Sequence, residues 1–291
     1  MIKFNLNGKP VIYTGNPEIR LLHFLRNIKG ITSVKDGCSC QGACGACLVE
    51  IDGEAKLACM TPVGKLDNAE INTLEGIPDK IRDAIATEFV EKGAVQCGFC
   101  TPGFLMRTKI LLQKNPQPSR DEIKKALTLN LCRCTGYVKI VDAIAEAANR
   151  LHPGQSSERK GTSGKVGTSY PKYEAFEMAV GKRKFVNDLH FEGMLYGALR
   201  FTDHPRAVIR EINISTALQV KGVIRIFISG DVPGDRYVGL IFKDWPLMIG
   251  PGETTRYIGD VLAGVVAETD EIARKAAALI EVSYDILDPV T

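Results

Sequence analysis

The stretch GCSCQGACGAC at residues 37–47 places four cysteines and three glycines within eleven positions. Two residues separate Cys44 from Cys47, and Cys59 follows after eleven more. A plant-type [2Fe–2S] site takes three thiolates from one tight loop and a fourth from farther along the chain. Glycines allow such a loop to fold over the metal and to aim backbone N–H groups at the sulfurs. The spacing therefore predicts a [2Fe–2S] cluster on Cys44, Cys47 and Cys59, with one further ligand from the loop.

The first ligand of this loop is the position that the spacing leaves open. The usual interval of four residues before Cys44 falls on Ser39, so the ligand is either Cys38 or Cys40. We predict Cys38, because the approach VKDGC at 34–38 is typical of such a loop, and Cys40 is then a spare thiol. A structural zinc site is the alternative, but zinc sites usually combine two similar ligand pairs rather than one glycine-rich loop and a distant cysteine.

A second group of cysteines lies in QCGFCTPG and LCRCTGY, which begin at residues 96 and 131. The short gap between Cys97 and Cys100 predicts that these two thiolates bind one iron, and that Cys132 and Cys134 bind the other. The Thr-Pro and Thr-Gly pairs that follow are typical of helix starts and turns, whose free N–H groups stabilise an anionic cluster. We therefore predict a second [2Fe–2S] cluster, with a second zinc site or two buried thiol pairs as alternatives.

The sequence around the first loop predicts a β-grasp, ferredoxin-like domain over residues 1–75. A helix is expected to begin at Asn16-Pro17 and to continue through Leu21, Leu22 and Leu25, with Gly30 just past its end. Asp52-Gly53 is typical of a tight hairpin turn. Alternating or short apolar runs predict strands at 2–6, 11–13, 47–51, 54–59 and 71–74.

Residues 76–151 change to helical periodicity and predict a four-helix bundle around the second cysteine group. The third of its helices begins at Ser119, where Glu122 completes a capping box. The four helices are expected at 78–92, 101–113, from 119 onward, and at 138–151. Residues 152–170, rich in glycine and hydroxyl side chains, are interpreted as a linker, and residues 171–291 as a separate α/β domain. The expected fold class is α+β.

Composition and charge narrow the functional classes. The net charge of +3 is too small to indicate a nucleic-acid or membrane-surface partner, and no apolar run is long enough to span a bilayer. All nine cysteines lie between Cys38 and Cys134, with no signal peptide ahead of them, so metal ligation in a reducing, cytoplasmic compartment is favoured over disulfides. The four histidines are dispersed, and no mononuclear metal site is predicted.

The two cysteine motifs together resemble the iron–sulfur segment of the xanthine dehydrogenase and aldehyde oxidoreductase family of molybdenum hydroxylases. This resemblance covers residues 1–151 continuously, whereas residues 171–291 resemble the α/β hammerhead domain of the same family through stretches such as GMLYGALRFTDHPRA. The additional residue in the first loop is similar to selenium-dependent xanthine dehydrogenases, which would favour a purine substrate.

The resemblance implies that Gln96 and Cys134 contact a molybdopterin, and that the ferredoxin-like cluster lies nearer a flavin. It also implies that the chain departs from full-length dehydrogenases, because a short linker stands where their flavin domain lies. The molybdenum-binding domains with the glutamate base are expected on a molybdopterin-binding large subunit, and FAD on a further partner subunit. No catalytic residue is therefore predicted in this chain.

The expected function is that of the electron-transfer subunit, or N-terminal part, of a heteromeric molybdenum hydroxylase acting on a purine, another N-heterocycle or an aldehyde. The first alternative is a stand-alone ferredoxin-like electron carrier with an accessory binding domain. The second is a zinc-stabilised interaction module without a redox role. The metal content and the visible spectrum separate the iron hypotheses from zinc.

Overall fold

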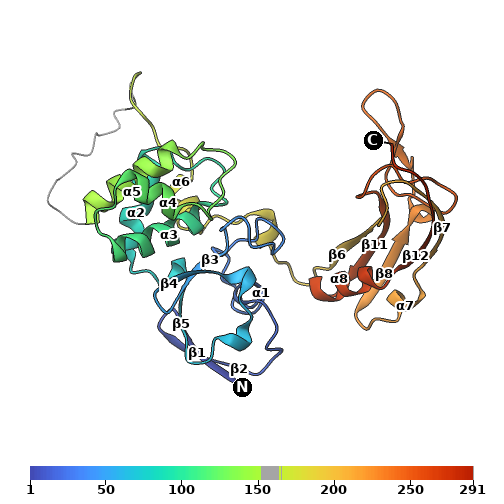
Figure 1. Cartoon of the computed structure of the whole chain (residues 1–291), viewed down its shortest axis with the longest axis horizontal. Helices are drawn as coiled ribbons and strands as arrows, with labels where there is room; N and C mark the ends of the chain where they lie inside the picture. Colours follow the sequence, from blue (N-terminus) through green and yellow to red (C-terminus); the bar gives the residue numbers. More distant parts are fainter. Residues whose placement is uncertain (152–163, 165, 291) are drawn as a thin grey trace. The chain divides into compact units, whose positions relative to one another are not determined.

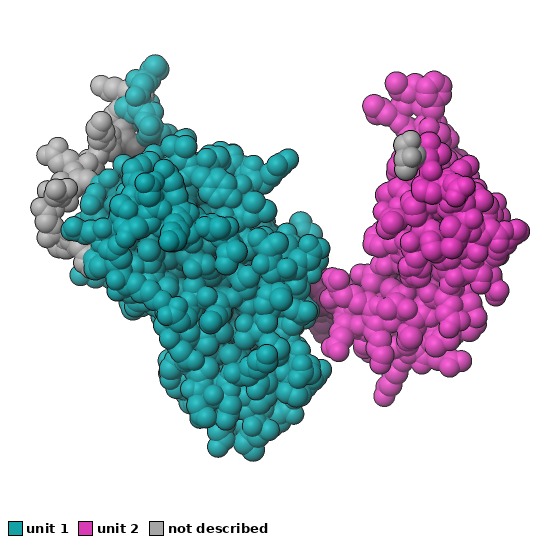
Figure 2. All heavy atoms as spheres, in the orientation of Figure 1, with its two compact units in different colours: residues 1–189 teal, residues 190–291 magenta. Residues whose placement is uncertain are grey.

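The computed structural model describes residues 1–151, 164 and 166–290. The chain divides into two compact units, Met1–Leu189 and His190–Thr291, which are drawn in teal and magenta in Figure 2. Among the described residues, no helix has the length and apolar character needed to cross a bilayer. Each unit has its own hydrophobic core and is described separately below.

The first part of unit 1 is a five-stranded sheet with the order β2-β1-β5-β3-β4 (Figure 1). β1 and β5 are parallel, and the other neighbours are antiparallel. Its strands are β1 (Ile2–Leu6), β2 (Lys9–Tyr13), β3 (Leu48–Ile51), β4 (Glu54–Leu57) and β5 (Glu70–Asn72). The predicted hairpin turn is present, since Asp52 and Gly53 both have positive φ between β3 and β4. This mixed sheet confirms the predicted ferredoxin-like architecture.

The helix that crosses this sheet is shorter than the sequence predicted. It begins as α1 (Leu21–His23) and continues as the π-helical turn Phe24–Ile28, so the predicted start at Asn16-Pro17 is wrong. The preceding residues are held in extended conformation, because Arg20 bridges to Pro62 and the Leu21 N–H donates to the Thr61 carbonyl at 2.7 Å. This pairing competes with helical hydrogen bonds, which local sequence patterns alone do not reveal.

The second part of unit 1 contains the four predicted helices. They are α2 (Asp79–Glu91), α3 (Thr101–Lys114), α4 (Arg120–Ala126) and α5 (Val138–Leu151). The predicted capping box is present: the Ser119 hydroxyl accepts from the Glu122 N–H, while the Glu122 carboxylate accepts from the Ser119 N–H at 2.7 Å. The helices share a core that includes Phe89, Phe104 and Ile144, each of which is buried.

The segment before residue 190 packs on this bundle, although the sequence placed everything after residue 170 in a separate domain. The short helix α6 (Ala175–Ala179) contacts α2 and α3, and Met178 and Val180 are buried in the bundle core. The compact units therefore divide at 189/190, because these apolar side chains complete the first core. The predicted linker lies largely outside the described residues.

The described residues of unit 2 form three small antiparallel sheets. One has the order β6-β11-β8 and is covered by α8, which packs on β6 and β11. The other two pair β7 with β12 and β9 with β10. The elements are β6 (Tyr196–Phe201), β7 (Ala207–Asn213), α7 (Ser215–Leu218), β8 (Val223–Ile228), β9 (Tyr237–Val238), β10 (Trp245–Pro246), β11 (Val261–Ala267), α8 (Asp270–Ala278) and β12 (Glu281–Ile286). This mixed unit has the predicted α/β character.

Candidate iron–sulfur sites

The first cysteine loop lies between the α1 turn and β3. Together with Cys59, which follows β4, it arranges the four predicted ligands as two pairs. The thiol of Cys38 lies beside that of Cys44, and the thiol of Cys47 lies beside that of Cys59. Cys59 reaches the loop because the β3–β4 hairpin reverses the chain, and the Ala58 N–H donates to the Cys47 carbonyl at 3.1 Å. Three of these cysteines, all except Cys38, are buried.

Backbone N–H groups of the loop surround the Cys38 sulfur, as the glycines of the motif predicted. Burial of the Cys38 thiol is outweighed by hydrogen bonds from the N–H groups of Ala43, Cys44 and Gln41, which lower its pKa. By contrast, burial raises the pKa of Cys47. Metal binding at this site therefore has to displace a proton from at least one buried thiol, as is general for thiolate ligation.

Cys40 packs near Cys59, and its hydrogen-bonding neighbours are not cysteines. Its sulfur is 3.6 Å from the His23 Nε2 atom and 3.6 Å from an Asp36 carboxylate oxygen. Burial, together with the Asp36 charge, raises the pKa of Cys40 to about 11. Both Ser39 and Cys40 have positive φ, which turns this part of the loop away from the Cys38–Cys44 pair.

The second group of cysteines also forms two pairs, but not the predicted ones. The Cys97 and Cys134 sulfurs are 3.6 Å apart, and the Cys100 thiol lies next to that of Cys132. The sequence predicted that neighbours in each motif share an iron. In the structure Gly98 turns with a φ of +81°, which separates Cys97 from Cys100, the N-cap of α3. Each thiol pair therefore contains one cysteine from QCGFCTPG and one from LCRCTGY.

Polar groups of the second motif stabilise the Cys132 sulfur. The Thr135 hydroxyl donates to it at 3.0 Å and the Thr135 N–H at 3.4 Å. Although burial opposes it, these hydrogen bonds lower the pKa of Cys132. Burial raises the pKa of Cys100, so the donor environment differs between the two thiols of this pair.

The pairwise arrangement bears on which metal the thiols fit. Among the described residues, no three ligand-type side chains converge closely enough to hold a single metal ion. A tetrahedral zinc site requires four ligands around one ion, whereas a [2Fe–2S] cluster spreads four thiolates over two irons. Two thiol pairs at each site match the two thiolates per iron of a [2Fe–2S] cluster.

The two sites are joined by direct contacts between their loops. The Leu131 N–H donates to the Cys44 carbonyl at 2.9 Å, and Leu131 immediately precedes Cys132. A Cβ atom on Gly45 would lie 2.1 Å from the Leu129 carbonyl oxygen, so only glycine permits this approach. The Asn130 side chain adds a hydrogen bond to the Gly45 carbonyl at 3.4 Å. Sequence reasoning missed this contact, because no local pattern relates the two motifs.

Gln96 and one thiol pair lie at the surface of unit 1. The side of the second motif that carries Gln96, Cys97 and Cys134 is exposed, unlike the buried Cys132. The Gln96 carbonyl accepts a hydrogen bond from Lys172. The exposed side is thus accessible to a further molecule.

Comparison with known proteins agrees with these two sites. A family model described as a 2Fe-2S iron-sulfur cluster binding domain matches residues 4–64, and a [2Fe-2S] binding domain matches residues 73–145. The aldehyde oxidase and xanthine dehydrogenase a/b hammerhead domain matches residues 180–288. The nicotinate dehydrogenase small FeS subunit of Eubacterium barkeri is 46% identical over 150 residues, which cover 51% of this chain and 95% of that protein.

This chain belongs to the xanthine dehydrogenase and aldehyde oxidoreductase family of molybdenum hydroxylases. Within that family it is the iron–sulfur part, with two [2Fe–2S] domains followed by a hammerhead domain. The predicted family and fold class are therefore confirmed.

Longer members of the family match both units. The aldehyde oxidoreductase of Megalodesulfovibrio gigas is 35% identical over 290 residues, which cover 93% of this chain and 32% of that protein. The solved aldehyde oxidoreductase of Desulfovibrio desulfuricans superposes with a TM-score of 0.89 at 31% identity, covering 99% of this chain and 34% of that one. The chain thus spans about a third of the length of these aldehyde oxidoreductases and nearly all of the small FeS subunit.

Proposed function

We propose that this chain carries electrons through two [2Fe–2S] clusters, away from a molybdopterin centre held by another polypeptide. Bound clusters of this type each accept and release one electron, which divides a two-electron substrate oxidation into single steps. The hydrogen bond between Leu131 and Cys44 carries the proposal, because it connects a residue adjacent to one cluster ligand directly with a ligand of the other.

The proposed ligands are the four thiol pairs described above. The ferredoxin-like site uses Cys38, Cys44, Cys47 and Cys59, and the bundle site uses Cys97, Cys100, Cys132 and Cys134. The choice of Cys38 over Cys40 is supported by its proximity to Cys44 and by the three N–H groups that surround its sulfur. Cys40 contacts His23 and Asp36 instead.

We place the molybdopterin partner at the exposed side of the bundle site. Gln96 and Cys134 are proposed to contact the pterin, since a glutamine amide can both donate and accept hydrogen bonds. Apolar side chains next to this motif are exposed to 54% at Leu129, 58% at Leu131 and 65% at Val138, which suits burial against a protein partner. The ferredoxin-like cluster would then pass electrons to FAD on a further subunit, or to another acceptor, in the cytoplasm.

The proposed substrate class is an aldehyde or an N-heterocycle such as a purine, hydroxylated on the partner. Relatives support this range, because their names include a nicotinate dehydrogenase and an aldehyde oxidoreductase. The chemistry takes place outside this chain, whose own residues hold the clusters and bring the two sites into contact.

Purification of the affinity-tagged chain from its native host tests the partner assignment. We expect molybdenum and a pterin, detected by metal analysis and by fluorescence after oxidation, to co-purify with the iron. A Gln96→Ala variant should lose pterin while keeping iron, whereas Gln113→Ala, on the far end of α3, should keep both. Iron-loaded protein without molybdenum or pterin would instead support the stand-alone carrier.

A further inference from the structure

Residues 172–189, hereafter the strap, cross both cysteine loops of unit 1. The [2Fe-2S] family models end at residue 145 and the hammerhead model begins at residue 180, so no iron–sulfur domain model includes the strap. It nevertheless packs with unit 1, beginning at Lys172 and continuing through α6.

The first half of the strap covers the loop that holds Cys97 and Cys100. The Lys172 ammonium donates to the Gln96 carbonyl. A Cβ atom on Gly98 would lie 2.6 Å from the Cβ of Met178, whose side chain is only 4% exposed. Met178 therefore lies directly over the turn between the two cysteines.

The second half reaches the ferredoxin-like loop through an aromatic pair. The rings of Phe99 and Phe185 meet edge to face, with centroids 5.2 Å apart. A Cβ atom on Gly37 would lie 3.4 Å from the Phe99 ring and 3.1 Å from the Cys44 sulfur. Phe99 thus belongs to the bundle motif, contacts the ferredoxin-like loop, and is packed against the strap.

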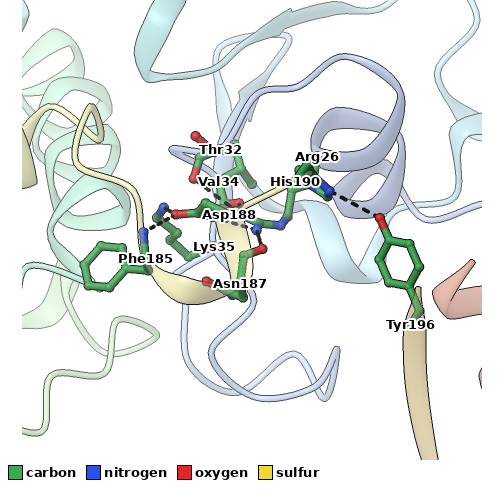
Figure 3. A network of polar contacts seen from close by, with 9 residues as sticks. All are labelled: Arg26, Thr32, Val34, Lys35, Phe185, Asn187, Asp188, His190 and Tyr196. Atoms are coloured by element: carbon green, nitrogen blue, oxygen red, sulfur yellow. Dashed lines mark hydrogen bonds and ion pairs between the residues drawn. The ribbon is translucent and has the colours of Figure 1, made fainter. Parts of the chain in front are cut away.

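A buried network of ion pairs binds the C-terminal end of the strap to Arg26 and Lys35. The Asp188 carboxylate accepts from Lys35, from Arg26 at 2.7 Å and from the Phe185 N–H at 3.0 Å (Figure 3). The side chains of Asp188 and Lys35 are fully buried, and the Lys35 ammonium lies 4.9 Å from the centre of the Phe185 ring. Arg26 also donates to the Asn187 carbonyl at 3.0 Å.

This network has a consequence for the loop that follows Lys35. Removing one partner of a buried ion pair leaves an uncompensated charge, which is far more costly than losing an exposed pair. Lys35 lies only three residues before Cys38, and its N–H donates to the Ala46 carbonyl at 3.2 Å. Asp188 therefore ties the strap to the entry of the ferredoxin-like site.

We propose that the strap limits water access to the side of each cluster site on which it packs and fixes the contact of Phe99 between them, with Asp188 and Phe185 as positioning residues. The inference rests on the proposed function, because it requires clusters on both loops. It assigns a role in protecting and tuning the clusters to a segment that follows the iron–sulfur domain matches and whose second half, with Phe185 and Asp188, lies within the hammerhead match. Solvent access and the surrounding charge are two of the factors that set the potential and the lability of such clusters.

The test compares strap variants of the full, cluster-loaded chain with matched controls. Asp188→Asn removes the anchor, and Phe185→Ala removes the aromatic contact without leaving a charge unpaired. Asp235→Asn, in an exposed ion pair with Lys243, and the exposed Phe191→Ala are the controls. The main readout is the anaerobic rate at which a strong iron chelator removes the visible absorbance of the clusters.

We expect chelator bleaching of both clusters to be at least about tenfold faster in Asp188→Asn, since a buried partner is lost and local opening becomes easier. Phe185→Ala should change the rate in the same direction, and both controls should stay within about twofold of the wild type. Asp188→Asn should also raise the midpoint potential of the ferredoxin-like cluster, because water and the unpaired Lys35 charge favour the more negative reduced state. A merely structural role of Asp188 would not move the potential in iron-replete protein.

The outcomes separate the two proposals. A wild-type chain without iron and labile sulfide would contradict the proposed function itself. A cluster-loaded wild type whose two strap variants bleach at the wild-type rate, with unchanged potentials, would overturn only the strap inference. If Asp188→Asn does not fold, the rate and potential of Phe185→Ala decide the question.

Discussion

Cys38 and Cys40 are separated by a single residue, yet the structure gives them different neighbours. Cys38 lies beside Cys44 and is surrounded by backbone donors, whereas Cys40 faces His23 and Asp36. Each iron of a [2Fe–2S] cluster takes two protein thiolates, and Cys38 lies beside the Cys44 thiol. Local backbone conformation therefore determines which of the two cysteines is placed to be the first cluster ligand.

The matched pair Cys38→Ser and Cys40→Ser tests this choice. We expect Cys38→Ser to lose the ferredoxin-like cluster, with about half of the iron, because one of four thiolate ligands is missing. Cys40→Ser should retain the iron and both EPR signals of the wild type. Iron analysis and EPR of the reduced proteins provide the measurement. The opposite pattern would make Cys40 the ligand.

At this scale, spacing in the sequence predicted which cysteines form each site, but not how they pair. The pairing of Cys97 with Cys134 depends on the turn at Gly98 and on the packing of two loops whose cysteines are 37 residues apart in the chain. The pair of Lys35 and Asp188 is separated by 153 residues, so no local pattern could have indicated it.

At the scale of elements, α3 connects the helical bundle to the ferredoxin-like sheet through two lysines. Lys109 reaches Glu50 of β3 at 2.5 Å, and both side chains are less than one tenth exposed. Lys114 reaches Glu54 of β4, but these side chains are 52% and 60% exposed. The same helix thus forms one buried and one exposed Lys–Glu ion pair with the sheet.

We expect Lys109→Met to destabilise the chain by about 3–5 kcal/mol, because Glu50 would remain buried without its partner. Lys114→Met should cost less than about 1 kcal/mol, since water already screens that pair. For a domain of this size the first change corresponds to a fall of roughly 10 °C in Tm, measured by circular dichroism. Equal losses of Tm in Lys109→Met and Lys114→Met would contradict the difference in burial between the two ion pairs.

The β9–β10 hairpin of unit 2 is fastened by the Glu253 carboxylate. It accepts from the Gly250 N–H and from the Tyr237 hydroxyl, each at 2.7 Å, and it is paired with Arg236. Although burial opposes them, these donors lower the pKa of Glu253. A lowered folded pKa means that the stabilisation is complete above the ordinary glutamate value of about 4.3, and is lost as the pH falls through the folded value.

Trp245 of β10 is the single tryptophan of the chain and reports on this hairpin. We expect its fluorescence to change in an acid transition below about pH 4.3, where protonated Glu253 stops holding the hairpin. Glu253→Gln should remove that transition, and Asp235→Asn, which belongs to an exposed pair in the same hairpin, should leave it in place. A transition that persists in Glu253→Gln would show that another group is responsible.

Element prediction from the sequence succeeded where local chemistry determines the boundary and failed where tertiary pairing does. The Ser119 capping box marks the start of α4 correctly. The start of α1 was misplaced, because the residues before Leu21 pair with those around Thr61. Helix α6 was assigned to the wrong core for the same reason, since the burial of Met178 depends on helices far away in the sequence.

At the scale of the whole molecule, the two cysteine sites in unit 1 are in direct contact through their loops, and the strap packs against part of each. Unit 2 contributes the hammerhead domain that the family model identifies. The chain therefore supplies two cluster sites and the contact between them, while the substrate chemistry is proposed to lie on a partner. The central claim is that the eight paired thiols hold two [2Fe–2S] clusters.

The most direct test of that claim is the iron, labile sulfide and zinc content of the anaerobically purified full chain, together with EPR after reduction. The account predicts about four iron atoms and four sulfides per chain, no stoichiometric zinc, and two distinct [2Fe–2S] signals. A colourless protein with stoichiometric zinc, or a single cluster with only half of that iron, would contradict it.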